Sequence, residues 1–328
     1  MFSHILVPLD ESELAEQALP HVVAIAPFDD ALITLLNVHE PLTSGSGGQT
    51  AEPVEWQLGS DRARSYLGSV AERLRGLGYR VEAEFIEGDP TVSILEFAKR
   101  NGVDLIVLTS HGAGGEEIHS LGEVALKTLL SAKTSVLIVR SFNPVFEHVV
   151  ATESVGKKRG YRQVLVPLDG SLRAEAALPY AERLSSDDGD RLHLVTVLRP
   201  TLPWPAGAAK EDEVQTRAAL AAASERAEQY LQGVPKAVAS PQRQLKTAVV
   251  DGDDIVGALD DYAGREQVDI KVMSAHGASG GTRSPYGSVT LDLLLYGFTP
   301  LLVVQDRATN ELHETHAERA AKERQGHG

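Results

Sequence analysis

The chain of 328 residues contains no cysteine. That absence excludes disulfides, thiolate metal sites and a cysteine nucleophile. No apolar run approaches the roughly 20 residues needed to span a bilayer, so we expect no membrane-spanning helix and no membrane partner. Because Met1–His4 leads directly into the first apolar run, there is no room for a signal peptide, and we expect a cytoplasmic protein.

Positive charge is scarce as well. The 31 Lys and Arg residues face 46 Asp and Glu residues, which gives a formal net charge of -15. Binding to nucleic acid depends on neutralising phosphates with Lys and Arg, so this balance argues against a nucleic-acid partner. An anionic ligand must then be held by local features against an unfavourable overall field. The length fits two globular domains.

Three signatures of known chemistry are also missing. Gly156-Lys157-Lys158 lacks the upstream glycine and the Ser or Thr of a P-loop. No G-x-G-x-x-G follows the first predicted strand of either half of the chain, which argues against a dinucleotide-binding fingerprint. Gly170-Ser171-Leu172 is not the G-x-S-x-G turn of α/β-hydrolases. Neither half groups Ser, His and Asp for nucleophilic hydrolysis, so we expect no enzyme of these classes.

The chain does contain a long internal repeat. Val-Pro-Leu-Asp occurs at residues 7–10 and again at residues 166–169, each time after an apolar run and before a helix that opens with serine. Further along, a glycine-containing segment at residues 109–115 recurs at residues 274–281. A repeat of this length indicates a whole domain used twice. The predicted parts are a domain at 1–140, a linker at 141–160, a domain at 161–305 and a polar C-terminal tail at 306–328.

Each half alternates short β-branched runs with longer helical patterns. This predicts an α/β fold made of two tandem, open, parallel-sheet, Rossmann-like domains. The first helix of each half is predicted as one continuous piece, at Ser12–Ala26 and at Ser171–Leu184. The predicted strands are Ile5–Leu9, Leu32–Val38, Val81–Ile86, Leu105–Thr109, Val136–Val139, Gln163–Leu168, Arg191–Leu198, Gln244–Val250, Ile270–Met273 and Leu301–Val304.

The repeated segments stand where ligands of open α/β sheets bind, beyond the carboxyl ends of strands at which the strand order reverses. Asp169 follows the first strand of the second half, and the glycine-containing loop follows the fourth. This loop, with Arg283 as a cation, leads to a helix N-terminus whose unpaired N–H groups and dipole favour an anion. Four glycines of the loop are expected to permit positive φ and close approach to a phosphate: 277, 280, 281 and 287.

At these residues the chain resembles the universal stress protein family in its tandem form. The nucleotide motif of that family is G-x2-G-x9-G-[S/T]. The second half reads Ser274-x2-Gly277-x9-Gly287-Ser288, so serine replaces the first glycine. The first half reads Thr109-x2-Gly112-x9-Gly122-Glu123 and departs at both the first and the last position.

The resemblance implies an ATP-binding stress-response protein that acts by changing shape or partner, with Mg²⁺ accompanying the ATP. It implies no catalytic residues and no metal site made by the protein alone. The residues carried over for adenosine and ribose are Pro167, Leu168, Asp169, Val197 and Met273. Those carried over for the phosphates are Ser274, Gly277, Gly287, Ser288 and Val289. Asp169 can accept hydrogen bonds from ribose hydroxyls or help to hold the cation.

The resemblance also implies the strand order 3-2-1-4-5 in each half and a pseudo-dimer in which the halves pair through their last strands. A homodimer of the whole chain stays open. Because Glu123 stands where Ser288 stands in the other half, we predict that the second half binds ATP and that the first binds it weakly or not at all. Whether Asp10, Gly112 and Gly122 contribute to a second site stays open.

Several alternatives remain at this stage. The chain can be a slow ATPase or nucleotidyl-transferring enzyme on the same scaffold, or a ligand-free pseudo-dimer. Asp10 and Asp169 can simply begin the turn into the first helix, before serine N-caps. His111 and His276 recur in both halves, and we expect them to order their loops by hydrogen bonding rather than to catalyse.

Overall fold

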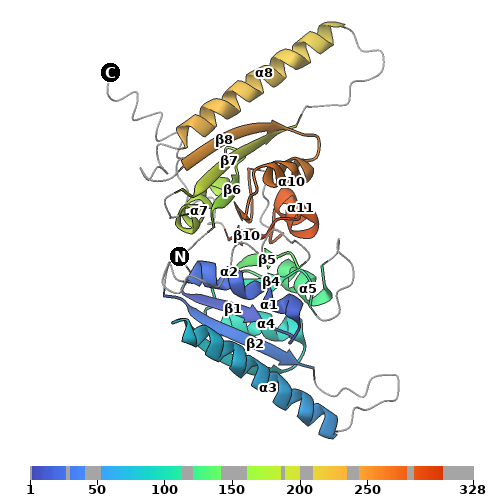
Figure 1. The fold of residues 1–328 in the computed structure, drawn as a ribbon. Helices are drawn as coiled ribbons and strands as arrows, with labels where there is room; N and C mark the ends of the chain where they lie inside the picture. Colours follow the sequence, from blue (N-terminus) through green and yellow to red (C-terminus); the bar gives the residue numbers. More distant parts are fainter. Residues whose placement is uncertain are drawn as a thin grey trace, which may run out of the picture. The chain divides into compact units, whose positions relative to one another are not determined.

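The computed structural model describes residues 2–26, 30–40, 53–112, 121–141, 161–185, 189–199, 210–234, 244–278 and 284–305. The chain divides into two compact units, Met1–Arg159 and Gly160–Gly328. Each unit alternates strands and helices in the same order along the chain, which the reader can follow by the colours in Figure 1. Residues 142–160 of the predicted linker and the predicted tail at 306–328 lie outside the described residues.

The first unit contains five strands within the described residues, and helices connect them. The strands are β1 His4–Pro8, β2 Leu32–His39, β3 Arg80–Glu87, β4 Leu105–Thr109 and β5 Ser135–Val139. The helices are α1 Glu13–Glu16, α2 Ala18–Ile25, α3 Pro53–Gly76, α4 Pro90–Arg100 and α5 Glu123–Ser131.

The second unit repeats this series. Its strands are β6 Gln163–Pro167, β7 Arg191–Leu198, β8 Gln244–Asp251, β9 Ile270–Ser274 and β10 Leu301–Val304. Its helices are α6 Leu172–Glu175, α7 Leu178–Leu184, α8 Lys210–Gly233, α10 Ile255–Arg265 and α11 Ser288–Tyr296.

The strands of each unit form a parallel sheet. The order is β3-β2-β1-β4-β5 in the first unit and β8-β7-β6-β9-β10 in the second. The central strands β1 and β6 each bury three consecutive residues completely, Ile5–Val7 and Val164–Val166, as strands covered on both faces do. The predicted fold class and the strand order 3-2-1-4-5 are therefore confirmed.

The first helix of each half is not continuous, and this prediction was wrong. Helices α1 and α2 separate at Gln17, and α6 and α7 separate at Ala176 and Ala177. The cause is a proline, Pro20 or Pro179, which has no N–H to donate to the carbonyl four residues earlier and whose ring crowds that carbonyl. The backbone there forms hydrogen bonds to the residue three positions earlier instead of four, such as Gln17 N to Leu14 O at 3.2 Å.

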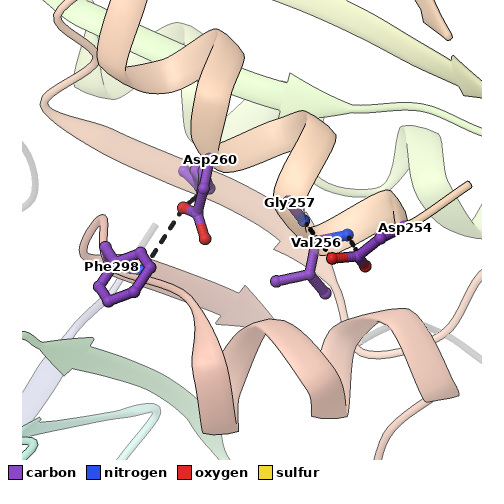
Figure 2. A network of polar contacts seen from close by, with 6 residues as sticks. Asp254, Val256, Gly257, Asp260 and Phe298 are labelled. Carbon is purple, nitrogen blue, oxygen red and sulfur yellow. Dashed lines mark hydrogen bonds and ion pairs between the residues drawn. The ribbon is translucent and has the colours of Figure 1, made fainter. Parts of the chain in front are cut away.

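Polar caps begin the helices largely where the sequence indicates them. Ser12 and Ser171 accept hydrogen bonds from Ala15 N and Ala174 N, both at 3.1 Å. The N-cap of helix α10 is Asp254, which accepts from Val256 N at 3.0 Å and Gly257 N at 3.1 Å (Figure 2). Such caps satisfy N–H groups that the first turn leaves unpaired.

Burial keeps His21 and His193 uncharged. His21 of α2 is 1% exposed, and burial lowers its pKa to about 3. His193 of β7 is fully buried, with Nδ1 3.0 Å from the Tyr262 hydroxyl and Nε2 2.8 Å from Gln163 Oε1. Burial lowers the pKa of His193 to about 4.

Acid is therefore expected to destabilise the protein through His193. Its folded pKa of about 4 lies below the reference value of 6.5, so the unfolded chain binds the proton more tightly. The stability that it contributes is complete above about pH 6.5 and is lost as pH falls toward 4. At pH 4.5 the loss is about 2–3 kcal/mol relative to pH 7. The equivalent residue of the first unit is Thr34. In urea unfolding at both pH values, His193→Thr should remove this share of the acid sensitivity, and an unchanged pH dependence would contradict the assignment.

Candidate functional site

A pocket opens at the carboxyl edge of the second sheet, where the order reverses between β6 and β9. It encloses about 660 Å³ of empty space, a volume that includes its open mouth. All ten residues carried over from the sequence resemblance line it: Pro167, Leu168, Asp169, Val197, Met273, Ser274, Gly277, Gly287, Ser288 and Val289. The structure thus brings together residues that lie more than one hundred positions apart in the sequence.

Six further lining residues were missed by the sequence reasoning: Ala174, Val195, Ile255, Leu259, His276 and Thr290. Some of them carried a usable signal. Val195 precedes Val197 by two positions on β7, so the two share a face of the strand. Ile255 and Leu259 are four residues apart on α10 and share a face of that helix. The others follow from the packing of helices against the sheet.

The inner part of the pocket is apolar. Val195 and Val197 of β7, Met273 of β9, and Ile255 and Leu259 of α10 contribute its side chains. Leu259 is fully buried and Met273 is 8% exposed. A compartment of this kind fits a flat, largely apolar ring whose polar edge can reach the backbone of the strand ends.

The outer part of the pocket is the N-terminus of α11. Gly287 is the N-cap, and among the described residues no side chain caps the first turn. The N–H groups of that turn and the positive end of the helix dipole therefore favour an anion. Ser288, at the first helical position, is exposed and adds a hydroxyl donor.

The predicted role of the glycines needs correction. Neither Gly277 nor Gly287 has a positive φ, and Gly287 is extended, at φ -69° and ψ 163°. A β-carbon on Gly277 would instead overlap Oδ2 of Asp169. Glycine is thus required at 277 by a neighbouring carboxylate, not by its own backbone conformation. Gly280, Gly281 and Arg283 lie outside the described residues.

Asp169 is surrounded by hydrogen-bond donors. Its Oδ1 accepts from the N–H of Ser171 at 3.0 Å and from the hydroxyl of Ser171 at 2.6 Å. Its Oδ2 accepts from the N–H of Ala278 at 2.7 Å. Asp169 therefore has the turn role that the sequence left open, because it accepts from Ser171 at the start of the first helix. It also contacts the loop after β9 through Ala278.

Serine at the first motif position has a structural role. The Ser274 hydroxyl donates to His276 O at 2.6 Å, and Thr109 makes the equivalent bond to His111 O at 2.8 Å in the first half. A glycine could not make this bond. The hydroxyl therefore tightens the loop, and the departure from the family motif leaves the pocket lining intact.

Both repeated histidines make hydrogen bonds through their rings, and that of His276 spans its loop as expected. His276 Nε2 lies 2.9 Å from the carbonyl of Ser284, across the turn that leads to α11. His111 Nδ1 lies 3.0 Å from Ser110 Oγ in a buried cluster. The His276 bond links the two described ends of the loop between β9 and α11, whereas the His111 bond joins neighbouring residues just after β4.

A half-buried phenol lies close enough to Asp169 to feel its charge. Tyr230 of α8 donates a hydrogen bond to Glu175 Oε1 at 2.9 Å, and Glu175 is only 4% exposed. Burial first, and then the carboxylates of Glu175 and Asp169, raise the pKa of Tyr230. The phenol therefore stays neutral and adds no negative charge near the pocket.

The first half differs at the equivalent helix start. Glu123 opens α5, and its Oε1 lies 2.5 Å from Lys127 Nζ one turn further along. Both side chains are exposed, by 77% and 57%. The carboxylate is thus held along the helix surface, and it occupies the turn that Ser288 leaves uncharged in the second half.

No described helix is long and apolar enough to cross a membrane. Within the same residues, no three His, Asp or Glu side chains gather closely enough to hold a metal ion by themselves.

Comparison with known proteins gives consistent matches. A sequence model described as the universal stress protein family matches residues 1–140 and 160–305. Universal stress protein MJ0531 of Methanocaldococcus jannaschii is 31% identical over 144 residues, which cover 43% of this chain and 83% of that protein. Universal stress protein MJ0577 of the same organism is 28% identical over 158 residues, covering 44% and 98%. The crystal structure of a universal stress protein from Archaeoglobus fulgidus DSM 4304 superposes with a TM-score of 0.59 at 20% identity, covering 92% of this chain and 98% of that one.

Proposed function

The chain belongs to the universal stress protein family, and from that premise we propose that its second half binds ATP in the pocket at the carboxyl edge of its sheet. Binding, rather than turnover, is the proposed activity, and it would act on the cell's stress response through a change of shape or partner.

One observation carries the proposal: all ten residues assigned to a nucleotide by family resemblance line a single pocket. Its apolar inner part suits adenine, between Val197 and Met273. Its outer part, at Gly287 and Ser288, offers N–H donors and the positive end of a helix dipole to the phosphates. The two parts are joined along the ends of β6 and β9, where the ribose would lie.

The residues present fit Mg²⁺ carried by the nucleotide. Mg²⁺ usually binds substrate phosphates, one or two carboxylates and several waters. Among the described lining residues Asp169 is the one carboxylate, and three donors already surround it. The protein would therefore receive Mg²⁺ together with the phosphates, and the ion would neutralise part of their charge.

The same contacts favour binding over hydrolysis. A general base must be free to take a proton from the attacking water. Asp169 is engaged by Ser171 and Ala278, and His276 by the Ser284 carbonyl. The described lining residues offer no other side chain suited to this role.

Nucleotide released from the protein tests the proposal. Freshly purified protein, denatured and analysed by mass spectrometry, should release adenine nucleotide, recovered mainly as ATP. Protein stripped of nucleotide should rebind ATP. A preparation that carries none and fails to bind added ATP would refute the proposal, and recovery as ADP alone would favour the hydrolytic alternative.

A further inference from the structure

The repeated aspartate and glycine are in direct contact in both halves of the chain. Asp169 follows β6 and Gly277 follows β9, and the carboxylate fills the space that a β-carbon on Gly277 would need. Its Oδ2 also accepts a hydrogen bond from Ala278 N at 2.7 Å. The carboxylate therefore joins the segments that follow two neighbouring strands, through two residues that are 109 positions apart along the chain.

The first half repeats this contact. Asp10 Oδ1 accepts from Ser12 N at 3.1 Å and from Ser12 Oγ at 2.5 Å. A β-carbon on Gly112 would overlap Asp10 Oδ2, as at Gly277. Yet this half has Glu123 where the nucleotide motif requires Ser or Thr. The contact between aspartate and glycine is thus present even in the half whose helix start lacks the Ser or Thr of the phosphate motif. The contact therefore does not depend on the features that would bind a nucleotide.

The number of hydrogen bonds that the Asp169 carboxylate can accept also argues against a ribose contact. A carboxylate has about four acceptor positions. Three of those on Asp169 are filled by Ser171 and Ala278, from within the protein. A ribose hydroxyl would find a group whose lone pairs are largely committed.

We propose that Asp169 is a positioning residue rather than a ribose ligand. It holds residues 274–278 in the shape that presents the phosphate site, and glycine at 277 is required because the carboxylate occupies the place of a side chain. This inference rests on the proposed ATP site. It differs from the family-based assignment, in which Asp169 contacts the ribose.

A thermodynamic cycle with a modified nucleotide separates the two roles. The probes are ATP and 2′,3′-dideoxy-ATP, which lacks the ribose hydroxyls, titrated into the intact wild-type chain and into Asp169→Ala and Asp169→Asn. Asparagine keeps the size of the side chain but has only one accepting oxygen. We expect the variants to weaken both nucleotides by the same factor, roughly ten- to a hundredfold. If the variants weaken ATP while leaving dideoxy-ATP unchanged, Asp169 contacts the ribose and the proposal is overturned. Asp10→Asn is the matched control in the first half and should leave ATP affinity unchanged.

A rescue experiment tests the positioning role from the glycine. Gly277→Ala should weaken ATP binding strongly in the wild-type background, because the new methyl group displaces the carboxylate. In the Asp169→Ala background the same change should have little further effect, since the space is then vacant. Full additivity of the two changes would contradict the proposal. Gly112→Ala is the matched control in the first half.

Amide hydrogen exchange decides the matter even if the ATP proposal fails. Ala278 is exposed, so protection of its N–H depends on the bond to Asp169. In nucleotide-free protein, followed by NMR, Asp169→Ala and Asp169→Asn should each speed exchange at Ala278 by roughly ten- to a hundredfold. Unchanged exchange in both variants would overturn the positioning role, whatever the wild-type protein binds.

Discussion

Replacing Ser288 with glutamate is expected to weaken ATP binding by roughly 30- to 150-fold. The substitution copies the first half, where Glu123 opens the equivalent helix. Two like charges about 4 Å apart repel by about 4 kcal/mol at an effective dielectric of about 20, and solvent screening at this exposed position reduces that to about 2–3 kcal/mol. The second half also lacks the lysine that holds Glu123: the residue one turn beyond Ser288 is Asp292.

Neutral substitutions at the same position separate charge from shape. Ser288→Gln matches glutamate in size and Ser288→Ala removes only the hydroxyl, so each should cost about tenfold or less in affinity. Glu123→Gln, in the first half, should leave the ATP site of the second half unaffected. Calorimetric titration measures all four variants. Equal losses for Ser288→Gln and Ser288→Glu would show that size rather than charge is responsible.

Replacing Lys271 with alanine is expected to lower the free energy of unfolding by about 3–5 kcal/mol. Lys271 is fully buried on β9, and its Nζ forms an ion pair with Asp260 of α10, whose side chain is 11% exposed. Asp260 Oδ1 also accepts a hydrogen bond from Phe298 N at 3.4 Å (Figure 2). Removal of the lysine leaves a largely buried carboxylate without its counterion, which is the costly case.

The first half supplies the control for this pair. Its equivalent positions hold the apolar residues Ile106, on β4, and Leu95, on α4. The double variant Lys271→Ile with Asp260→Leu should therefore recover most of the stability that Lys271→Ala loses, because apolar replacement of a buried ion pair is often neutral or stabilising. Urea unfolding gives the free energies. A cost below about 1 kcal/mol for Lys271→Ala, or a double variant no more stable than the single one, would contradict this account.

The sequence predicts the fold well because its strands are buried on both faces. Runs such as Ile5–Leu9 and Leu301–Val304 are continuously apolar, and the structure places strands there within a residue or so. The first helix of each half was predicted wrongly because helical periodicity continues across Pro20 and Pro179. The break in each helix comes from the missing N–H of the proline and from its ring, and neither property changes the spacing of the apolar residues.

The ion pair of Lys271 shows a different limit. Periodicity identifies β9, but not the partner of a lysine in the middle of it. Asp260 lies on the preceding helix, and only the packing of α10 against the sheet brings the two charges together. Pairwise contacts between elements depend on packing that a single sequence does not display.

The ten site residues predicted by resemblance line one pocket, but their individual roles were less predictable. The resemblance assigns Asp169 to the ribose or to the cation, and the hydrogen bonds that it makes within the protein, to Ser171 and Ala278, could not be read from the sequence. Gly277 was expected to adopt a positive φ, whereas it makes room for that carboxylate. Spacing identifies which residues gather at the strand ends, and only side-chain geometry shows which of them face one another.

The number of ATP molecules bound per chain tests the central claim most directly. Isothermal titration calorimetry of the intact, nucleotide-free chain with Mg²⁺-ATP should give one site, which resides in the second half. Two equivalent sites would show that Glu123 does not impair the first half, and the absence of any site would remove the nucleotide from the account altogether.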